Sequence, residues 1–68
     1  MLKFTKISDG HHRAVGNLDT IYECCKSDGV WFVILTQYGI PEESPMDFAT
    51  LRQARDWARI QDSYLEGI

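Results

Sequence analysis

The segment from Leu18 to Tyr38 constrains the fold of this chain more than any other part of the sequence. It consists of two runs rich in β-branched and aromatic residues, joined by the tripeptide Ser27-Asp28-Gly29. Such side chains suit the pleated surface of a sheet, and glycine supplies the positive φ that a tight turn needs. The segment therefore predicts a β-hairpin with strands over residues 18–26 and 30–38.

Both faces of this predicted hairpin are apolar. We expect Lys26 to pair with Val30 across a three-residue turn, so that Cys25 lies opposite Trp31. Successive side chains of a strand point to opposite faces, so the pairing assigns every residue to a face. One face carries Thr20, Tyr22, Cys24, Phe32, Ile34 and Thr36, and the other carries Ile21, Glu23, Cys25, Trp31, Val33 and Leu35. A single helix can cover only one of these faces.

The remaining segments predict an α+β fold. Residues 2–7 and 11–15 form two more short strands, and residues 39–47, with two prolines and three acidic side chains, form a loop. Thr50 and Gln53 have the spacing of a capping box, and apolar residues recur with helical period after them. We expect a helix over residues 51–64, packed on one face of an antiparallel meander of three or four strands.

Composition narrows the class of protein. The chain has 68 residues, enough for one small domain, and its formal net charge of −3 does not favour binding to nucleic acid through bulk electrostatics. No apolar run is long enough to cross a membrane, and residues 1–10 lack the apolar core of a signal peptide. The two cysteines are adjacent and diverge in a strand, so we expect free thiols, a cytoplasmic location and no membrane partner.

The sequence predicts neither an enzyme nor a metal centre. His11, His12, Cys24 and Cys25 are metal-binding residue types, but adjacent strand positions diverge and zinc ligands have other spacings. A catalytic cysteine would need a neighbouring base and a lowered thiol pKa, and the chain has no glycine-rich turn or nucleophile elbow. We therefore predict no catalytic residue, no metal ligand and no cofactor.

Three arginines form a row on the predicted helix. Arg52, Arg55 and Arg59 are spaced at i, i+3 and i+7, on the face opposite the apolar stripe. One interpretation is contact with phosphates or with an acidic partner. The alternative, which we favour, is a solvated face on which Arg52 pairs with Asp56 and Arg59 pairs with Asp62 or Asp56.

The second apolar face of the hairpin is the strongest functional signal. Trp31, Val33 and Leu35 form its centre, and Ile21 lies beside them. Leaving a Leu-sized side chain in water costs roughly 1.5–3 kcal/mol, and a contiguous apolar patch on a small protein usually marks a partner surface. These four residues are the predicted protein-binding site.

Two alternatives to this site remain open. The first strand, the loop over residues 39–47 or the C-terminal residues 64–68 could fold over the second face and bury it. If Trp31 faces the helix instead, Phe32, Tyr22 and Ile34 form the free patch.

Trp31-Phe32-Val33, followed after a loop by the segment from Phe48 to Ala58, resembles the small accessory proteins encoded by bacteriophages and prophages. The segment has the pattern F-x-T-L-x-x-A-x-x-W-A. It also resembles the arm-site DNA-binding domains of phage-type tyrosine integrases, in which a three-stranded sheet packs on a helix that opens with Phe-x-Thr. The resemblance covers roughly the C-terminal two-thirds of the chain and implies the α+β fold and a phage-like origin.

The integrase-like domains lay the sheet in the major groove of DNA, which requires basic residues on the strands. Here the second face offers apolar residues and Glu23, with Lys26 alone at the turn. We therefore predict a small non-enzymatic protein-binding module whose partner is a second copy or a host protein. The alternative is DNA binding through Lys26, Arg13 and the three helix arginines.

Overall fold

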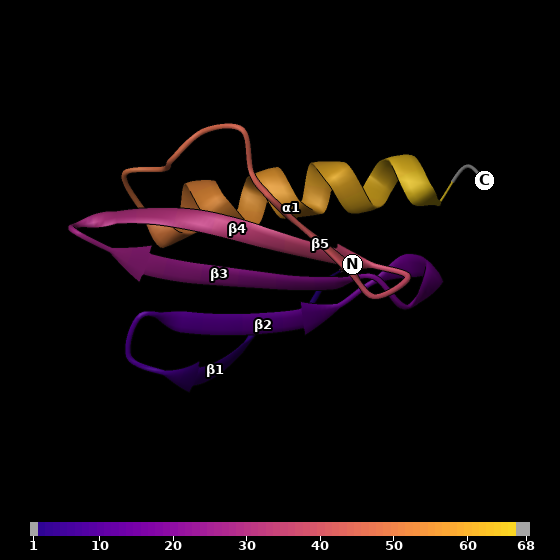
Figure 1. Cartoon of the computed structure of the whole chain (residues 1–68), viewed down its shortest axis with the longest axis horizontal. Helices are drawn as coiled ribbons and strands as arrows, with labels where there is room; N and C mark the ends of the chain where they lie inside the picture. The colour runs from indigo at the N-terminus through magenta and orange to yellow at the C-terminus, as the bar shows by residue number, and fades with distance from the viewer. Residues whose placement is uncertain (1, 67–68) are drawn as a thin grey trace.

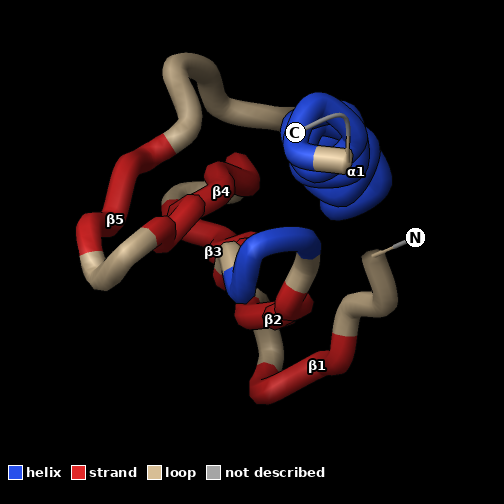
Figure 2. The backbone as a smooth tube through the Cα atoms, turned by 90° about the vertical axis from the view of Figure 1, so that its right-hand side faces the viewer, coloured by secondary structure: helices blue, strands red, loops and turns tan. Residues whose placement is uncertain are grey.

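The computed structural model describes residues 2–66 as a five-stranded antiparallel sheet with one helix packed across it. The sheet order is the chain order, from β1 at one edge to β5 at the other. Figure 1 shows α1 running along the sheet, and Figure 2 shows that it covers one side only. The predicted α+β class is confirmed, with more strands than expected. The elements are β1 (Thr5–Ser8), β2 (His11–Val15), the 3-10 turn η1 (Asn17–Asp19), β3 (Ile21–Ser27), β4 (Val30–Gln37), β5 (Ile40–Glu43) and α1 (Leu51–Leu65).

The central hairpin of β3 and β4 closes with a two-residue turn. Asp28 and Gly29 both have positive φ, at 52° and 81°, which is the combination found in a type I′ turn. Lys26 therefore pairs with Trp31 rather than with Val30. The predicted pairing is wrong by one residue, and such a shift moves every side chain of β4 to the opposite face.

A second tight hairpin adds β5 where the sequence predicted a loop. Tyr38 and Gly39 have positive φ values of 54° and 77°, and Gln37 pairs with Ile40 across them. Pro41 has no backbone N–H to donate, but an edge strand tolerates this because its outer side has no neighbouring strand. The prediction of a loop over residues 39–47 is therefore wrong for β5.

The first strands also differ from the predicted bounds. β1 covers residues 5–8 rather than 2–7, and its register with β2 shifts between Lys6 and Ser8. Leu18 and Asp19 in η1 both have φ of 56°, so β3 begins at Ile21 rather than at residue 18. This 3-10 turn connects β2 to β3.

The hydrophobic core lies between the sheet and α1. Tyr22, Cys24 and Val33 rise from the sheet and are fully buried, and Ala54 and Ala58 meet them from α1. The small alanine side chains allow the helix to lie close to the strands. No helix within residues 2–66 is long and apolar enough to cross a membrane. The other buried apolar residues of the core are Leu2, Ala14 and Phe48.

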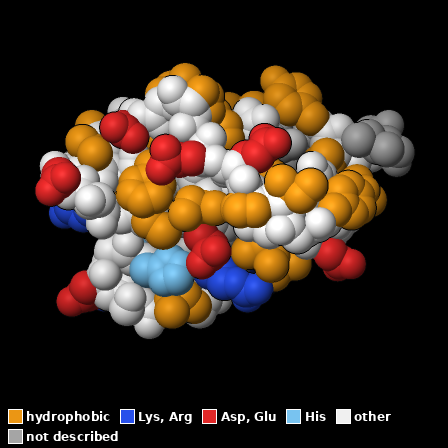
Figure 3. Space-filling model, viewed as in Figure 1, with side chains coloured by type: hydrophobic (Ala, Val, Ile, Leu, Met, Phe, Trp, Pro, Cys, Tyr) orange, Lys and Arg blue, Asp and Glu red, His pale blue; other side chains and the backbone are white. Residues whose placement is uncertain are grey.

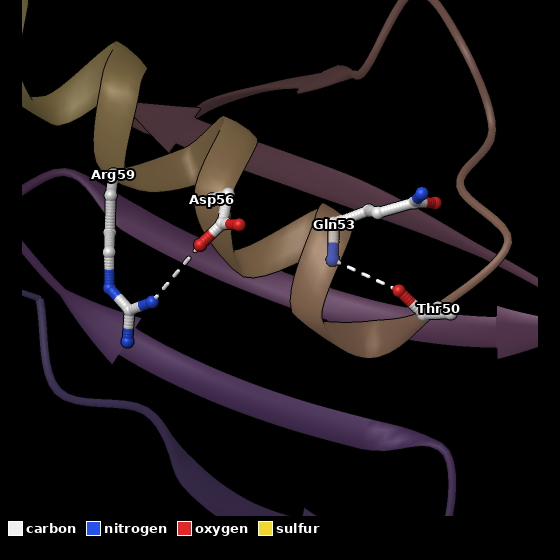
Figure 4. A network of polar contacts seen from close by, with 4 residues as sticks. All are labelled: Thr50, Gln53, Asp56 and Arg59. Atoms are coloured by element: carbon white, nitrogen blue, oxygen red, sulfur yellow. Dashed lines mark hydrogen bonds and ion pairs between the residues drawn. The ribbon is translucent and has the colours of Figure 1, made fainter.

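The predicted capping box opens α1. The backbone N–H of Gln53 donates to the hydroxyl of Thr50 over 3.2 Å (Figure 4), and the Gln53 side chain accepts from the backbone N–H of Ala49 over 3.0 Å. The first bond satisfies an N–H group that the first helical turn cannot pair internally, and the second pairs the N–H of Ala49, the residue that precedes the N-cap. The helix continues to Leu65, one residue beyond its predicted end.

Candidate functional site

The side of the sheet that α1 leaves uncovered, here named the free face, carries both apolar and charged side chains. Strand pairing arranges its side chains in rows across the sheet. Figure 3 views the molecule from this side and shows hydrophobic side chains in a band, with histidine, acidic and basic side chains below them. The rows are His11, Cys25 and Phe32; then Arg13, Glu23, Ile34 and Glu43; then Val15, Ile21, Thr36 and Pro41.

The structure corrects the predicted protein-binding residues. Val33 is fully buried beneath α1, and Trp31 and Leu35 pack against the same core. Of the four predicted residues, Ile21 alone lies on the free face. The cause is the two-residue turn, which places the odd-numbered residues of β4 toward the helix.

The β4 side chains on the free face are Phe32 and Ile34, both half-buried. This matches the open alternative in which Trp31 faces the helix, except for Tyr22. Tyr22 is fully buried in the core and takes no part in the free patch.

Within residues 2–66, no segment folds over the free face. Leu2 is buried in the core beside α1, β5 extends the sheet, and the helix lies on the other side (Figure 2). The predicted alternative that one of these segments covers the face does not hold for the described residues, and residues 67–68 lie outside them. The face is therefore a surface of this part of the molecule.

A polar group interrupts the free face over β2 and β3. Nε2 of His11 lies 2.7 Å from the Glu23 carboxylate, with side-chain exposures of 32% and 29%, so the pair is half-buried. Arg13 lies directly opposite Glu23 in the sheet. The free face therefore combines apolar side chains with a group of charged ones.

The edges of the sheet are poorly suited to accept another strand. The register shift between Lys6 and Ser8 interrupts the pairing pattern of β1, and Pro41 removes a backbone donor from β5. Charged side chains, Lys6 on β1 and Glu42 on β5, add to this protection. These features disfavour edge-to-edge pairing of the sheet with another strand.

Cys24 and Cys25 point to opposite faces, as expected for adjacent strand residues. Cys24 is buried in the core, and Cys25 is half-buried on the free face. Burial raises the pKa of the Cys24 thiol to about 11, and burial together with the Glu23 carboxylate raises the pKa of Cys25. Both thiols therefore remain protonated near neutral pH, and nucleophilic chemistry at either is disfavoured.

His11 and His12 are also separated by the sheet. His11 pairs with Glu23 on the free face, whereas the His12 ring lies on the helix side, 5.7 Å from the Trp31 ring in an edge-on arrangement. In the described part of the chain, no group of three or more His, Cys, Asp and Glu side chains could hold a metal ion. No pocket opens on the surface of these residues.

The row of helix arginines is divided. Arg52 is exposed, but Arg55 and Arg59 are half-buried, with their Cζ atoms 5.7 Å and 6.0 Å from the centre of the Phe4 ring. The row therefore flanks the buried stripe instead of lying opposite it. Arg59 also pairs with Asp56 at 3.4 Å (Figure 4), one of the predicted pairings.

Asp62 is a buried carboxylate that sequence reasoning placed on the solvated side of the helix. It is 6% exposed and accepts hydrogen bonds from the backbone N–H of Asn17 at 2.8 Å, the Asn17 amide at 2.9 Å and the Tyr22 hydroxyl at 3.1 Å. A Cβ on Gly16 would collide with this carboxylate, so glycine permits the close approach of the backbone to Asp62. The predicted Arg59–Asp62 pair is wrong, because Asp62 instead joins α1 to η1 and β3.

Asp62 could have been recognised from its position. It follows the buried Ala54 and Ala58 at four-residue intervals, which places it on the inner stripe of the helix. A buried carboxylate must find hydrogen-bond donors, and the polar residues around Gly16-Asn17 were candidates.

No family model matches the sequence, and no curated protein and no solved structure was found to be similar to it. The class is therefore defined by the fold itself. Over residues 2–66 the chain is a small α+β domain with a five-stranded antiparallel meander, one covering helix and a sheet face that no described segment covers.

Proposed function

We propose that this protein is a small non-enzymatic binding module that acts through the free face, and that the surface it binds is the free face of a second copy. The observation that carries the proposal is the set of apolar side chains on β3 and β4 that no described segment covers. Its central members are Ile21, Cys25, Phe32 and Ile34.

The free face retains apolar surface that association would remove from water. Val15 and Val30 at its margins are 53% and 36% exposed, and Phe32 and Ile34 between them are half-buried. Burial of apolar area contributes roughly 25 cal/mol per Å². Sheets pack face to face at about 10 Å with strands nearly aligned, so two free faces can form one apolar layer.

Opposite charges near the two edges of the free face support a second copy of the chain as the partner. Arg13 lies on β2, near one edge of the sheet, and Glu43 lies on β5, at the other edge, in the same row of the free face. A twofold axis parallel to the strands would place β5 of each copy over β2 and β1 of the other. Glu43 would then face the partner's Arg13 twice in one symmetric dimer, and such complementarity fixes the alignment of the interface.

The observations favour protein over DNA as the ligand of the sheet. Glu23 and Glu43 lie on the free face and would repel phosphates, and Lys26 pairs with Trp31 on the helix side. A cytoplasmic location and a phage-like origin remain predictions from the sequence. A host protein as the partner is an outcome that the following experiment distinguishes.

The test is sedimentation equilibrium of wild-type protein and of Ile34→Glu over a wide concentration range. We expect the wild-type mass to rise toward that of a dimer, and Ile34→Glu to remain a folded monomer. Ile60→Glu is the matched control, because Ile60 is 51% exposed on α1 and should not affect association. A wild-type protein that stays monomeric beside a folded Ile34→Glu variant would rule out the self-interface and leave the face to a different protein.

A further inference from the structure

The buried side-chain nitrogen atoms that lack a hydrogen-bond partner within residues 2–66 belong to one neighbourhood. They are Nδ1 of His12, Nε of Arg55 and Nε of Arg59. Both guanidinium groups lie over the Phe4 ring, in the segment that precedes β1, and His12 lies on the adjacent strand β2. Figure 2 shows this N-terminal segment beside α1, on the helix side of the sheet.

The charges in this neighbourhood are mainly positive. Burial lowers the pKa of His12 first, and the positive charges of Arg55, Lys6 and His11 lower it further. Arg55 forms no ion pair within the described residues, and Arg59 pairs only with Asp56, at 3.4 Å. Lys6 pairs with Asp9 at 2.9 Å, where the Asp9 side chain is fully exposed and the attraction is screened by solvent.

Half-buried cations with so few carboxylate partners are costly to hold together, and a bound anion would offset that cost. The Phe4 ring lies within cation–π distance of both guanidinium groups, at 5.7 Å and 6.0 Å from their Cζ atoms, and holds the two cations side by side. Because both Nε atoms are covered by protein, the contacts to a ligand would come from the terminal amino groups.

We propose that Arg55, Arg59, Lys6 and His12 form a binding site for a phosphate group, either free or as a phosphomonoester. The guanidinium fork matches the spacing of phosphate oxygens, and three permanent positive charges match a dianion. Because Nδ1 of His12 is covered by protein, the ring N–H that can donate to the ligand is that of Nε2. This site lies on the helix side of the sheet and is independent of the free face.

The experiment is a titration of the ¹⁵N-labelled protein with inorganic phosphate at constant ionic strength, followed by NMR. We expect saturable shifts at the amides of Phe4 and His12, and a higher pKa for the His12 ring, because a nearby anion favours its protonated form. Arg55→Gln should weaken binding by about tenfold, the loss expected for one charge-assisted hydrogen bond. Arg52→Gln is the matched control, since Arg52 is exposed on the same helix, and should change binding by less than about twofold.

A second variant and a second ligand sharpen the result. Lys6→Gln removes a charge whose side chain is 59% exposed, so weaker binding there cannot be attributed to loss of core packing. Adenosine monophosphate, with adenosine as control, identifies the source of the phosphate group. Equal affinity for phosphate and for the nucleotide would mean that the site binds free phosphate. Tighter binding of the nucleotide would mean that the ligand is a phosphomonoester. Shifts that fail to saturate, or that are unchanged in both Arg55→Gln and Lys6→Gln, would overturn the proposal.

Discussion

The hydrogen bond from the Tyr22 hydroxyl to Asp62 permits a sharp test of how α1 is joined to the sheet. Tyr22 is fully buried and donates to the carboxylate over 3.1 Å, so Tyr22→Phe removes one bond to a charged acceptor while it keeps the ring. Such a bond contributes about 1.5–3 kcal/mol. A domain of this size has a free energy of unfolding of about 3–10 kcal/mol, so the loss is a large fraction of the total.

The assay is equilibrium unfolding in urea, monitored by tryptophan fluorescence. With a slope of about 1 kcal/mol per M for a small domain, the midpoint should fall by at least about 1 M in Tyr22→Phe, with the slope unchanged. Tyr38→Phe is the control, because Tyr38 is 83% exposed and its change should stay within about 0.5 kcal/mol. If the two variants were equally stable, the Asp62 network would not join the helix to the sheet as described.

The pKa shifts of two groups predict that the protein loses stability at alkaline pH and also at acidic pH. The pKa of Cys24 rises from 9.0 to about 11 on folding, so the unfolded chain loses its proton first, and the free energy of unfolding should fall between about pH 9 and 11. Cys24→Ala should remove much of this alkaline decline in urea titrations. The pKa of His12 falls below 6.5 on folding, so the unfolded chain binds a proton first, and stability should fall as the pH drops below about 6.5. His12→Gln should flatten this acid limb, and an unchanged limb in either variant would contradict its assignment.

Local sequence patterns predicted the class of fold well, because they encode backbone preferences. The hairpin of β3 and β4, the C-terminal helix and its Thr50 cap all follow from residue type and spacing. β5 was missed because its two flanking signals conflict: Tyr38-Gly39 forms a tight turn, but Pro41 and the acidic residues after it are typical of a loop. Pairing along the outer side of β4 overrides that local preference.

The candidate site was harder to predict because it depends on register. Ser27-Asp28-Gly29 permits either a three-residue or a two-residue turn, and positive φ at both Asp28 and Gly29 decides for the shorter one. This difference of one residue in the length of the turn places Phe32, and not Trp31, on the free face. Of the two alternatives left open by the sequence, the uncovered face is the one found within residues 2–66, whereas most of the residues named for it lie on the other side.

The measurement that tests the proposed self-interface most directly is the sedimentation of variants in which the charges of Arg13 and Glu43 are reversed. We expect Arg13→Glu and Glu43→Arg each to weaken self-association, because each variant places like charges opposite one another twice in its own dimer. An equimolar mixture of the two variants should sediment as a dimer, since both contacts then join opposite charges. A mixture that remains monomeric at concentrations where the wild-type protein is dimeric would contradict the arrangement of the free faces proposed for this protein.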